Sequence, residues 1–325
     1  MSQQTVVKTE ALTKKYGDFT ALDNLSIELQ AGQILGFIGP NGAGKTTTIK
    51  ILVGLSKPTS GTASICSVNC TVETRKIKRL VGYMPDTFGL YENMRVREYL
   101  DFFGAAFGIP RRRRQERMNA AMDMTGAAGM ADLFVESLSH GMKQRVALSR
   151  IMLHDPPVLI LDEPANGLDP TARVEMREML LKLAAAGKTL IVTSHILPEL
   201  SRICNMVAIM TGGKLRAFGS IDQIMKQVRA KRIIEIQLLG PGDVPAAAAS
   251  AAALENASDV RPAEAESLVR FTTTVDESGL AEMLRQLMRI NPGIAQFREV
   301  PQDLEDAFLS VTQQTQMPSG TGGES

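Results

Sequence analysis

The feature that most constrains the fold is a glycine-rich loop that joins an apolar run to a helix-compatible segment. The run over residues 33–38 is short and apolar, which predicts a buried strand. The loop after it reads Gly39-Pro40-Asn41-Gly42-Ala43-Gly44-Lys45-Thr46, with the spacing G-x4-G-K-T, and residues 45–55 are predicted to be helical. In this strand–loop–helix unit of an α/β fold, successive backbone N–H groups and the helix N-terminus form a nest for phosphate.

Several side chains beside this loop are suited to nucleotide chemistry. Lys45 is a point charge for the β- and γ-phosphates, the Thr46 hydroxyl is a ligand for Mg²⁺, and we expect Thr47 to bind the same nucleotide. A second apolar strand, residues 157–162, ends in Asp162, which is predicted to hold Mg²⁺. Glu163 follows it and is positioned to polarise a water as a general base, the alternative being a paired surface carboxylate.

Composition and charge exclude several classes of protein. A length of 325 residues allows one large domain and a smaller one, and a net charge of +1 gives no basic field for nucleic acid. No apolar run approaches the roughly 18–20 residues that cross a bilayer, and the N-terminus has no secretory signal pattern. The three cysteines suit a reducing compartment; Cys66 and Cys70 lack a second ligand pair and are interpreted as structural thiols rather than metal ligands. A role at a membrane would therefore be exercised from the cytosol through a partner.

Hydrophobic periodicity divides the chain into an α/β part, a helical insertion and a smaller C-terminal part. Residues 5–30 are predicted to be short strands, and residues 87–150 an amphipathic helical segment. A helix is expected to begin near Pro170 with Asp169 as its cap. Further predictions are a strand over 189–193 and a hairpin over 206–218 that turns at Gly212-Gly213.

The C-terminal part is predicted to be a small α+β domain of about 80 residues in a β-α-β-α-β-α order. Its predicted elements are strands at 234–238, 268–275 and 294–300, and helices at 279–290 and 303–311. The alanine-rich stretch over 246–257 is interpreted as a helix, with a flexible linker as the alternative. The polar tail after Thr312 is predicted to be disordered.

One further motif narrows the use of the nucleotide. Leu138-Ser139-His140-Gly141-Met142 lies upstream of the 157–162 strand, and together with the glycine-rich loop and Asp162-Glu163 it resembles the ATP-binding cassette of ABC transporters. The common signature of that family is Leu-Ser-Gly-Gly-Gln, so His140 and Met142 are departures from it. The cassette motifs follow one another in the family's order over residues 5–225.

The resemblance implies a P-loop NTPase fold with an antiparallel β subdomain and a helical insertion, followed by the small α+β domain. The expected bounds are 1–228 for the cassette, about 87–150 for its helical subdomain, 229–312 for the accessory domain and 313–325 for the tail.

The resemblance also implies roles for individual residues. Tyr16 matches the aromatic residue that stacks on adenine, and His195 matches the switch histidine that contacts the γ-phosphate and orients Glu163. Ser139 and Gly141 would contact the γ-phosphate held by an opposite subunit, and the loop containing Asp169 would cross the dimer contact.

A second departure follows Tyr83-Met84-Pro85, where the family usually has a glutamine. This chain has Asp86 at that position, and we expect it to remain a metal-side residue that couples hydrolysis to the membrane subunit.

The function implied is that of an ATP-hydrolysing subunit, using Mg²⁺, that powers a separate transmembrane permease from the cytosolic face of the membrane. Two such subunits, identical or not, would share two ATP sites. The segment Leu304-Glu305-Asp306-Ala307-Phe308 resembles an ending common in ABC-2-type exporter ATPases, which favours export. The alternative is an ABC ATPase that is not coupled to transport, and a simple P-loop kinase would leave Ser139, Gly141 and His195 unexplained.

Overall fold

The computed structural model describes residues 4–194, 197–229, 232–290 and 293–300. The chain divides into two compact units, Met1–Ile221 and Asp222–Ser325. Helix α8 (Ile221–Arg229) begins at this division. The domain boundary predicted after residue 228 lies near the last residue of the same helix. His195, the predicted helix at 303–311 and the predicted tail lie outside the described residues. Within the described ranges, no helix has both the length and the apolar character needed to span a bilayer.

The first unit contains a six-stranded sheet in the order β10-β9-β3-β8-β7-β6. Its strands are β3 (Ile34–Ile38), β6 (Val81–Met84), β7 (Val158–Asp162), β8 (Thr189–Thr193), β9 (Met206–Thr211) and β10 (Lys214–Ser220). Neighbouring strands are parallel except for β10, which pairs with β9 as the predicted hairpin. All residues of β3, β7 and β8 are buried, as expected for parallel strands covered on both faces. The carboxyl ends of these three strands therefore lie at one edge of the sheet.

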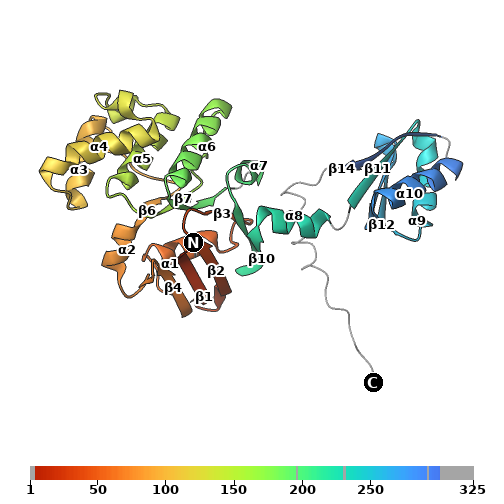
Figure 1. Ribbon diagram of the computed structural model, residues 1–325, viewed down its shortest axis with the longest axis horizontal. Coiled ribbons are helices and arrows are strands. Elements are labelled where there is room, and N and C mark those ends of the chain that lie inside the picture. Colours follow the sequence, from red (N-terminus) through yellow and green to blue (C-terminus); the bar gives the residue numbers. More distant parts are fainter. Residues whose placement is uncertain (1–3, 195–196, 230–231, 291–292, 301–325) are drawn as a thin grey trace, which may run out of the picture. The chain divides into compact units, whose positions relative to one another are not determined.

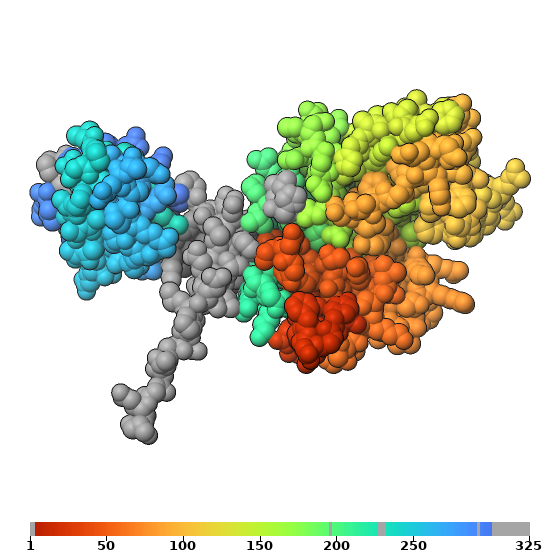
Figure 2. All heavy atoms as spheres, turned by 180° about the vertical axis from the view of Figure 1, so that it is seen from behind, coloured from red at the N-terminus to blue at the C-terminus, as the bar shows by residue number. Residues whose placement is uncertain are grey.

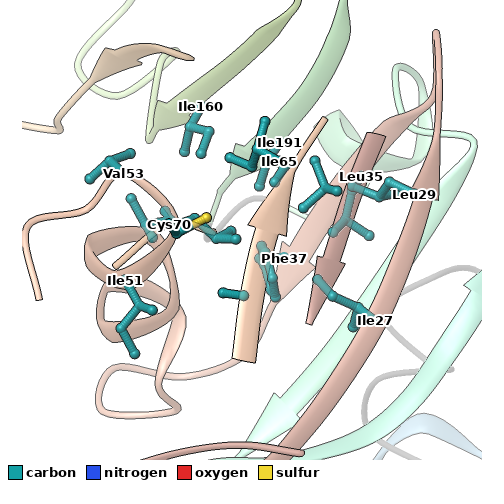
Figure 3. Close-up of a cluster of buried hydrophobic side chains, with 14 of the residues drawn as sticks. Ile27, Leu29, Leu35, Phe37, Ile51, Val53, Ile65, Cys70, Ile160 and Ile191 are labelled. Carbon is teal, nitrogen blue, oxygen red and sulfur yellow. The ribbon is translucent and has the colours of Figure 1, made fainter. Parts of the chain in front are cut away.

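The first unit also contains an antiparallel sheet in the order β2-β1-β4-β5. It consists of β1 (Thr5–Tyr16), β2 (Phe19–Gln30), β4 (Ser60–Ile65) and β5 (Val68–Asn69). Helix α1 (Lys45–Leu52) shares one apolar core with both sheets, and Figure 3 shows Leu35 of β3 beside Leu29 of β2 in the same cluster as Ile51 of α1. Ile51, Ile65 and Leu35 are completely buried in this core. The core holds β3 and α1 in place, so it fixes the loop between them.

The helical insertion lies apart from the antiparallel sheet. Its helices are α3 (Val96–Ala106), α4 (Arg111–Thr125) and α5 (His140–Met152), with two short 3₁₀ turns before α5. Figure 1 shows these helices gathered at one end of the first unit, and Figure 2 shows the same orange-to-yellow region from behind. The remaining helices of this unit are α2 (Thr74–Leu80), α6 (Pro170–Ala185) and α7 (Leu197–Ser201). Helices thus form within the predicted interval 87–150.

After helix α8, the described residues of the second unit form a four-stranded antiparallel sheet, in the order β12-β13-β11-β14, with helices α9 and α10. Its elements are β11 (Arg232–Leu238), α9 (Val244–Ala252), β12 (Ala257–Ala263), β13 (Leu268–Thr273), α10 (Glu277–Ile290) and β14 (Ile294–Val300). The alanine-rich stretch is helical as far as Ala252, which confirms a helix there, whereas Ala257 at its predicted end belongs to β12. The predicted alternation of strands and helices is wrong, because β12 was missed. This edge strand carries Asp259 and Pro262, residues that are rare inside strands, and it has little apolar character.

Candidate nucleotide site

The glycine-rich loop connects β3 to α1 as predicted, and its path requires glycine at positions 39 and 44. A Cβ atom on Gly39 would lie 2.4 Å from the Met210 carbonyl oxygen, well inside van der Waals contact. Gly44 has φ of 104°, a conformation that side chains disfavour, and it immediately precedes the first residue of α1. The sequence therefore forms a tight curl whose backbone ends at a helix N-terminus, the geometry that binds phosphate.

Lys45 is folded over its own loop. Its ammonium group donates hydrogen bonds to the carbonyl oxygens of Gly39 at 2.5 Å and Pro40 at 3.2 Å. Burial lowers the pKa of Lys45 below its ordinary value, while the charges of Glu163 and Asp162 act in the opposite direction. The side chain thus lies between the loop and the two carboxylates.

The acidic end of β7 is held by the neighbouring strand. Asp162 is 8% exposed and pairs in register with Thr193 of β8. The Thr193 hydroxyl donates to Asp162 Oδ1 at 2.6 Å and accepts from the Glu163 N–H at 2.9 Å. Glu163 has φ of 52°, in the left-handed region, which is unusual for a residue with a side chain. A single buried hydroxyl therefore orients both acidic residues. Sequence reasoning missed Thr193, although a hydroxyl at the end of an apolar parallel strand is a recognisable signal.

These groups line one cavity of about 260 Å³. Its walls are the loop residues Pro40, Asn41, Gly42, Ala43, Gly44, Lys45, Thr46 and Thr47, together with Phe19, Ala21, Asp86, Asp162 and Glu163. The structure therefore brings most of the predicted nucleotide and metal residues into one place. Gly39 takes part through its carbonyl group, which accepts from Lys45, and is not part of the lining.

The aromatic residue at this cavity differs from the predicted one. Tyr16, at the end of β1, is half exposed and its ring lies 4.8 Å from the Lys14 ammonium nitrogen, outside the cavity lining. Phe19, its partner across the β1–β2 turn, lines the cavity and is 63% exposed. Tyr16 and Phe19 are only three positions apart in the sequence. Only the geometry of the β1–β2 hairpin shows which of the two rings lines the cavity.

The three residues that were predicted to hold a metal all offer oxygen atoms as ligands. Thr46, Asp162 and Asp86 all line the cavity, and they offer a hydroxyl and two carboxylates. Across the described residues, no group of three or more His, Cys, Asp or Glu side chains forms a metal site by itself. This donor set fits Mg²⁺, which typically takes one or two carboxylates and completes its shell with water and substrate phosphate.

The predicted signature residues begin helix α5. Ser139 is its N-cap, and the Ser139 hydroxyl oxygen accepts from the Met142 N–H at 3.3 Å. A Cβ on Gly141 would meet only Ala172 and Leu168, at an ordinary 3.5 Å. Internal packing therefore does not require glycine at position 141, in contrast to Gly39.

Ser139 and Gly141 line a second cavity, of about 400 Å³, that is separate from the first. Asp169 lies in the same lining and caps α6 by accepting from the Ala172 N–H at 2.9 Å, as predicted from the Asp-Pro pair. No residue of the glycine-rich loop lines this second cavity. The two groups of predicted ATP contacts are thus apart within one chain.

Fold and site together define a class of protein: a P-loop ATPase with an antiparallel β subdomain and a helical subdomain. Comparisons with known proteins agree. The profile of the family described as ABC transporter matches residues 22–166. The chain is 33% identical over 309 residues to the Nod factor export ATP-binding protein I of Ralstonia nicotianae, and the match covers 94% of each protein.

Two other relatives support the same assignment. The chain is 39% identical over 235 residues to the bacitracin transport ATP-binding protein BcrA of Bacillus licheniformis, covering 72% of this chain and 75% of that protein. A solved ATP-binding subunit of an ABC transporter is 30% identical, with a TM-score of 0.62, covering 68% of this chain and 92% of the other. The chain belongs to the ABC transporter family, as one of its ATP-binding, ATP-hydrolysing cassettes.

Proposed function

We propose that this chain is the ATPase subunit of an exporter, and that two such subunits enclose two ATP molecules and drive a separate transmembrane permease. The observation that carries the shared-site mechanism is the separation of the two cavities. The loop residues, Asp162 and Glu163 line one of them, and Ser139, Gly141 and Asp169 line the other. Each cavity presents half of the predicted ATP contacts, and a second subunit would supply the missing half.

Each cavity residue then has a role that follows from its chemistry. The loop N–H groups and Lys45 bind the β- and γ-phosphates, and Lys45 exchanges its present carbonyl partners for phosphate oxygens. Thr46 and Asp162 would hold Mg²⁺, which supplies positive charge to the phosphates when bound. Glu163 accepts a proton from the attacking water, a contribution of roughly 10²–10⁴-fold for a positioned general base. His195 remains predicted to contact the γ-phosphate.

The second half of the site acts across the dimer. The Ser139 hydroxyl and the Gly141 N–H lie at the N-terminus of α5, where the helix dipole favours an anion. They would donate to the γ-phosphate bound by the partner, and the loop at Asp169 would cross the dimer contact. Binding of ATP would therefore favour the closed dimer, and hydrolysis would remove the γ-phosphate that holds it.

A trapped-dimer experiment tests this mechanism. Glu163→Gln removes the general base and keeps the shape of the side chain, so ATP should persist and hold two subunits together. Light scattering should then show a dimer with ATP and a monomer with ADP. Ser139→Ala in the Glu163→Gln background should abolish the dimer and leave nucleotide binding to each chain intact. A dimer that forms without nucleotide, or that survives the loss of Ser139, would contradict the shared site.

Coupling to a permease, and the direction of export, rest on the relatives. The Nod factor and bacitracin proteins are named for export and transport of those compounds, and both are named as ATP-binding proteins. We infer that this chain likewise works at the cytosolic face of the membrane, as a peripheral subunit. Affinity purification from membranes should recover an integral membrane protein together with this chain. Recovery of full ATPase activity with no membrane partner would favour the alternative, a cassette ATPase not coupled to transport.

A further inference from the structure

Asn166 lies in the turn after β7, and hydrogen bonds fix it on three sides. Its N–H donates to the Glu163 carbonyl oxygen at 3.0 Å. Its side-chain Nδ2 donates to Asp86 Oδ1 at 3.1 Å, and Asp86 lines the nucleotide cavity. Its carbonyl oxygen lies 3.0 Å from His140 Nε2 and 3.2 Å from Gln144 Nε2, both on helix α5. One residue therefore bonds to the main chain of Glu163, to Asp86 at the cavity and to the signature helix.

The directions of the hydrogen bonds to Asn166 follow from its chemistry. A carbonyl oxygen only accepts, so the Nε2 of His140 must carry the hydrogen that it donates to Asn166. Gln144 Nε2, itself a donor, then cannot use His140 Nε2 as an acceptor, although the two atoms are 3.4 Å apart. Both side chains donate to the same carbonyl oxygen, which has two lone pairs for them. Gln144 is 3% exposed, and the bond from its Nε2 to the Asn166 carbonyl oxygen sets the direction of its amide.

The next residue permits the close approach of the imidazole. Gly167 has φ of 71°, and a Cβ there would lie 3.2 Å from His140 Nε2. Any side chain at this position would crowd the imidazole that contacts Asn166. The turn after β7 is therefore shaped around His140, one of the two residues by which the signature departs from the common family pattern.

We propose that Asn166 is a positioning residue that holds Asp86 at the metal side of the nucleotide cavity, and that His140 and Gln144 hold Asn166. The inference rests on the proposed function. A glutamine at position 86 would carry its own donor, whereas an aspartate carboxylate only accepts. Asn166 supplies the missing donor and fixes one carboxylate oxygen, so the other keeps a defined direction. Asp86 and His140, two residues that differ from the common family pattern, thus both form hydrogen bonds with Asn166.

A double-mutant cycle tests the inference through binding rather than turnover. Calorimetry measures the affinity for AMP-PNP, an ATP analogue that is not hydrolysed, once with Mg²⁺ and once with EDTA. Asn166→Ala should lower the affinity about threefold with Mg²⁺, the scale of one modest hydrogen bond, and leave it unchanged in EDTA. In an Asp86→Ala background the same substitution should have no further effect. Asn119→Ala, at an exposed asparagine of α4, is the matched control and should change neither affinity.

Two further variants separate positioning from a disturbed turn. Asn166→Asp places a carboxylate against Asp86 and should reduce the Mg²⁺-dependent affinity more than Asn166→Ala does. His140→Ala removes one donor to Asn166 and should change the affinity in the same direction, again only with Mg²⁺. An effect of Asn166→Ala that is equal in EDTA, or that persists in the Asp86→Ala background, overturns the inference.

Lys45→Ala separates failure of this inference from failure of the proposed function. Lys45→Ala should weaken AMP-PNP binding under both conditions. If the wild-type chain does not bind AMP-PNP, or if Lys45→Ala is without effect, the proposed function fails, and the inference fails with it. If both behave as expected and Asn166→Ala matches the wild type, only the inference is wrong.

Discussion

Gly141→Ala should remove activity without harming the fold. The added Cβ would lie 3.5 Å from Ala172 Cβ and Leu168 Cδ2, ordinary contact distances, and Gly141 is helical rather than left-handed. Alanine is favoured over glycine in a helix by at most about 1 kcal/mol. For a unit of this size that gain raises the Tm by at most about 3 °C. The methyl group would instead project into the cavity where a partner's γ-phosphate is proposed to bind.

Scanning calorimetry, nucleotide titration and an ATPase assay distinguish these effects. We expect an unchanged or slightly raised Tm, unchanged ADP affinity of the single chain, and turnover reduced by about 100-fold, the scale of losing one aligned donor to a reacting oxyanion. Gly39→Ala is the contrasting variant, because its Cβ would overlap the Met210 carbonyl, and it should cost about 1–3 kcal/mol of stability. A lowered Tm or weakened ADP binding in Gly141→Ala would refute the reasoning.

Three further predictions concern other parts of the chain. Thr193→Val leaves Asp162 and the Glu163 N–H without their shared hydroxyl, so urea unfolding should show a loss of about 1–3 kcal/mol together with lower turnover. Phe19→Ala should weaken ATP binding by about 1–3 kcal/mol if its ring stacks on the base, and Tyr16→Ala less; equal effects in titrations would assign stacking to neither ring alone. In the second unit, burial acts to raise the pKa of Glu235, but hydrogen bonds and charge from Arg298 and Arg270 outweigh this effect. The pKa of Glu235 therefore lies below its ordinary value. A carboxylate with a lowered pKa stabilises the fold above its unfolded pKa of about 4.3 and loses that contribution as the pH falls further. The Tm of the wild-type chain should therefore exceed that of Glu235→Gln near neutral pH, and this difference should shrink below about pH 4.

Sequence reasoning was most successful where local chemistry dictates local structure. The G-x4-G-K-T spacing fixed the strand–loop–helix unit, because only glycines fit the curl at Gly39 and Gly44. The Asp169-Pro170 pair likewise marked the start of α6, since a capping side chain and a proline at the first turn have few other uses. Buried apolar runs located β3, β7 and β8 because both faces of a parallel sheet are covered.

It failed where structure depends on distant neighbours. β12 has a weak strand sequence and owes its conformation to pairing with β13 at the edge of the sheet. Likewise, the contacts of Phe19 and Asn166 depend on which elements lie beside them. Asn166 bonds to Asp86, which lies 80 positions earlier in the sequence, a relation that periodicity and spacing do not encode.

The shared site is tested most directly by mixing two inactive variants. Lys45→Ala disables the loop half of a chain, and Ser139→Ala disables its signature half. A mixed dimer has one site that combines the intact loop of one chain with the intact signature of the other. Random assortment makes half of the dimers mixed, each with one intact site of two, so turnover should recover to about a quarter of the wild-type value. A mixture as inactive as either variant alone would contradict the proposal that two chains complete each ATP site.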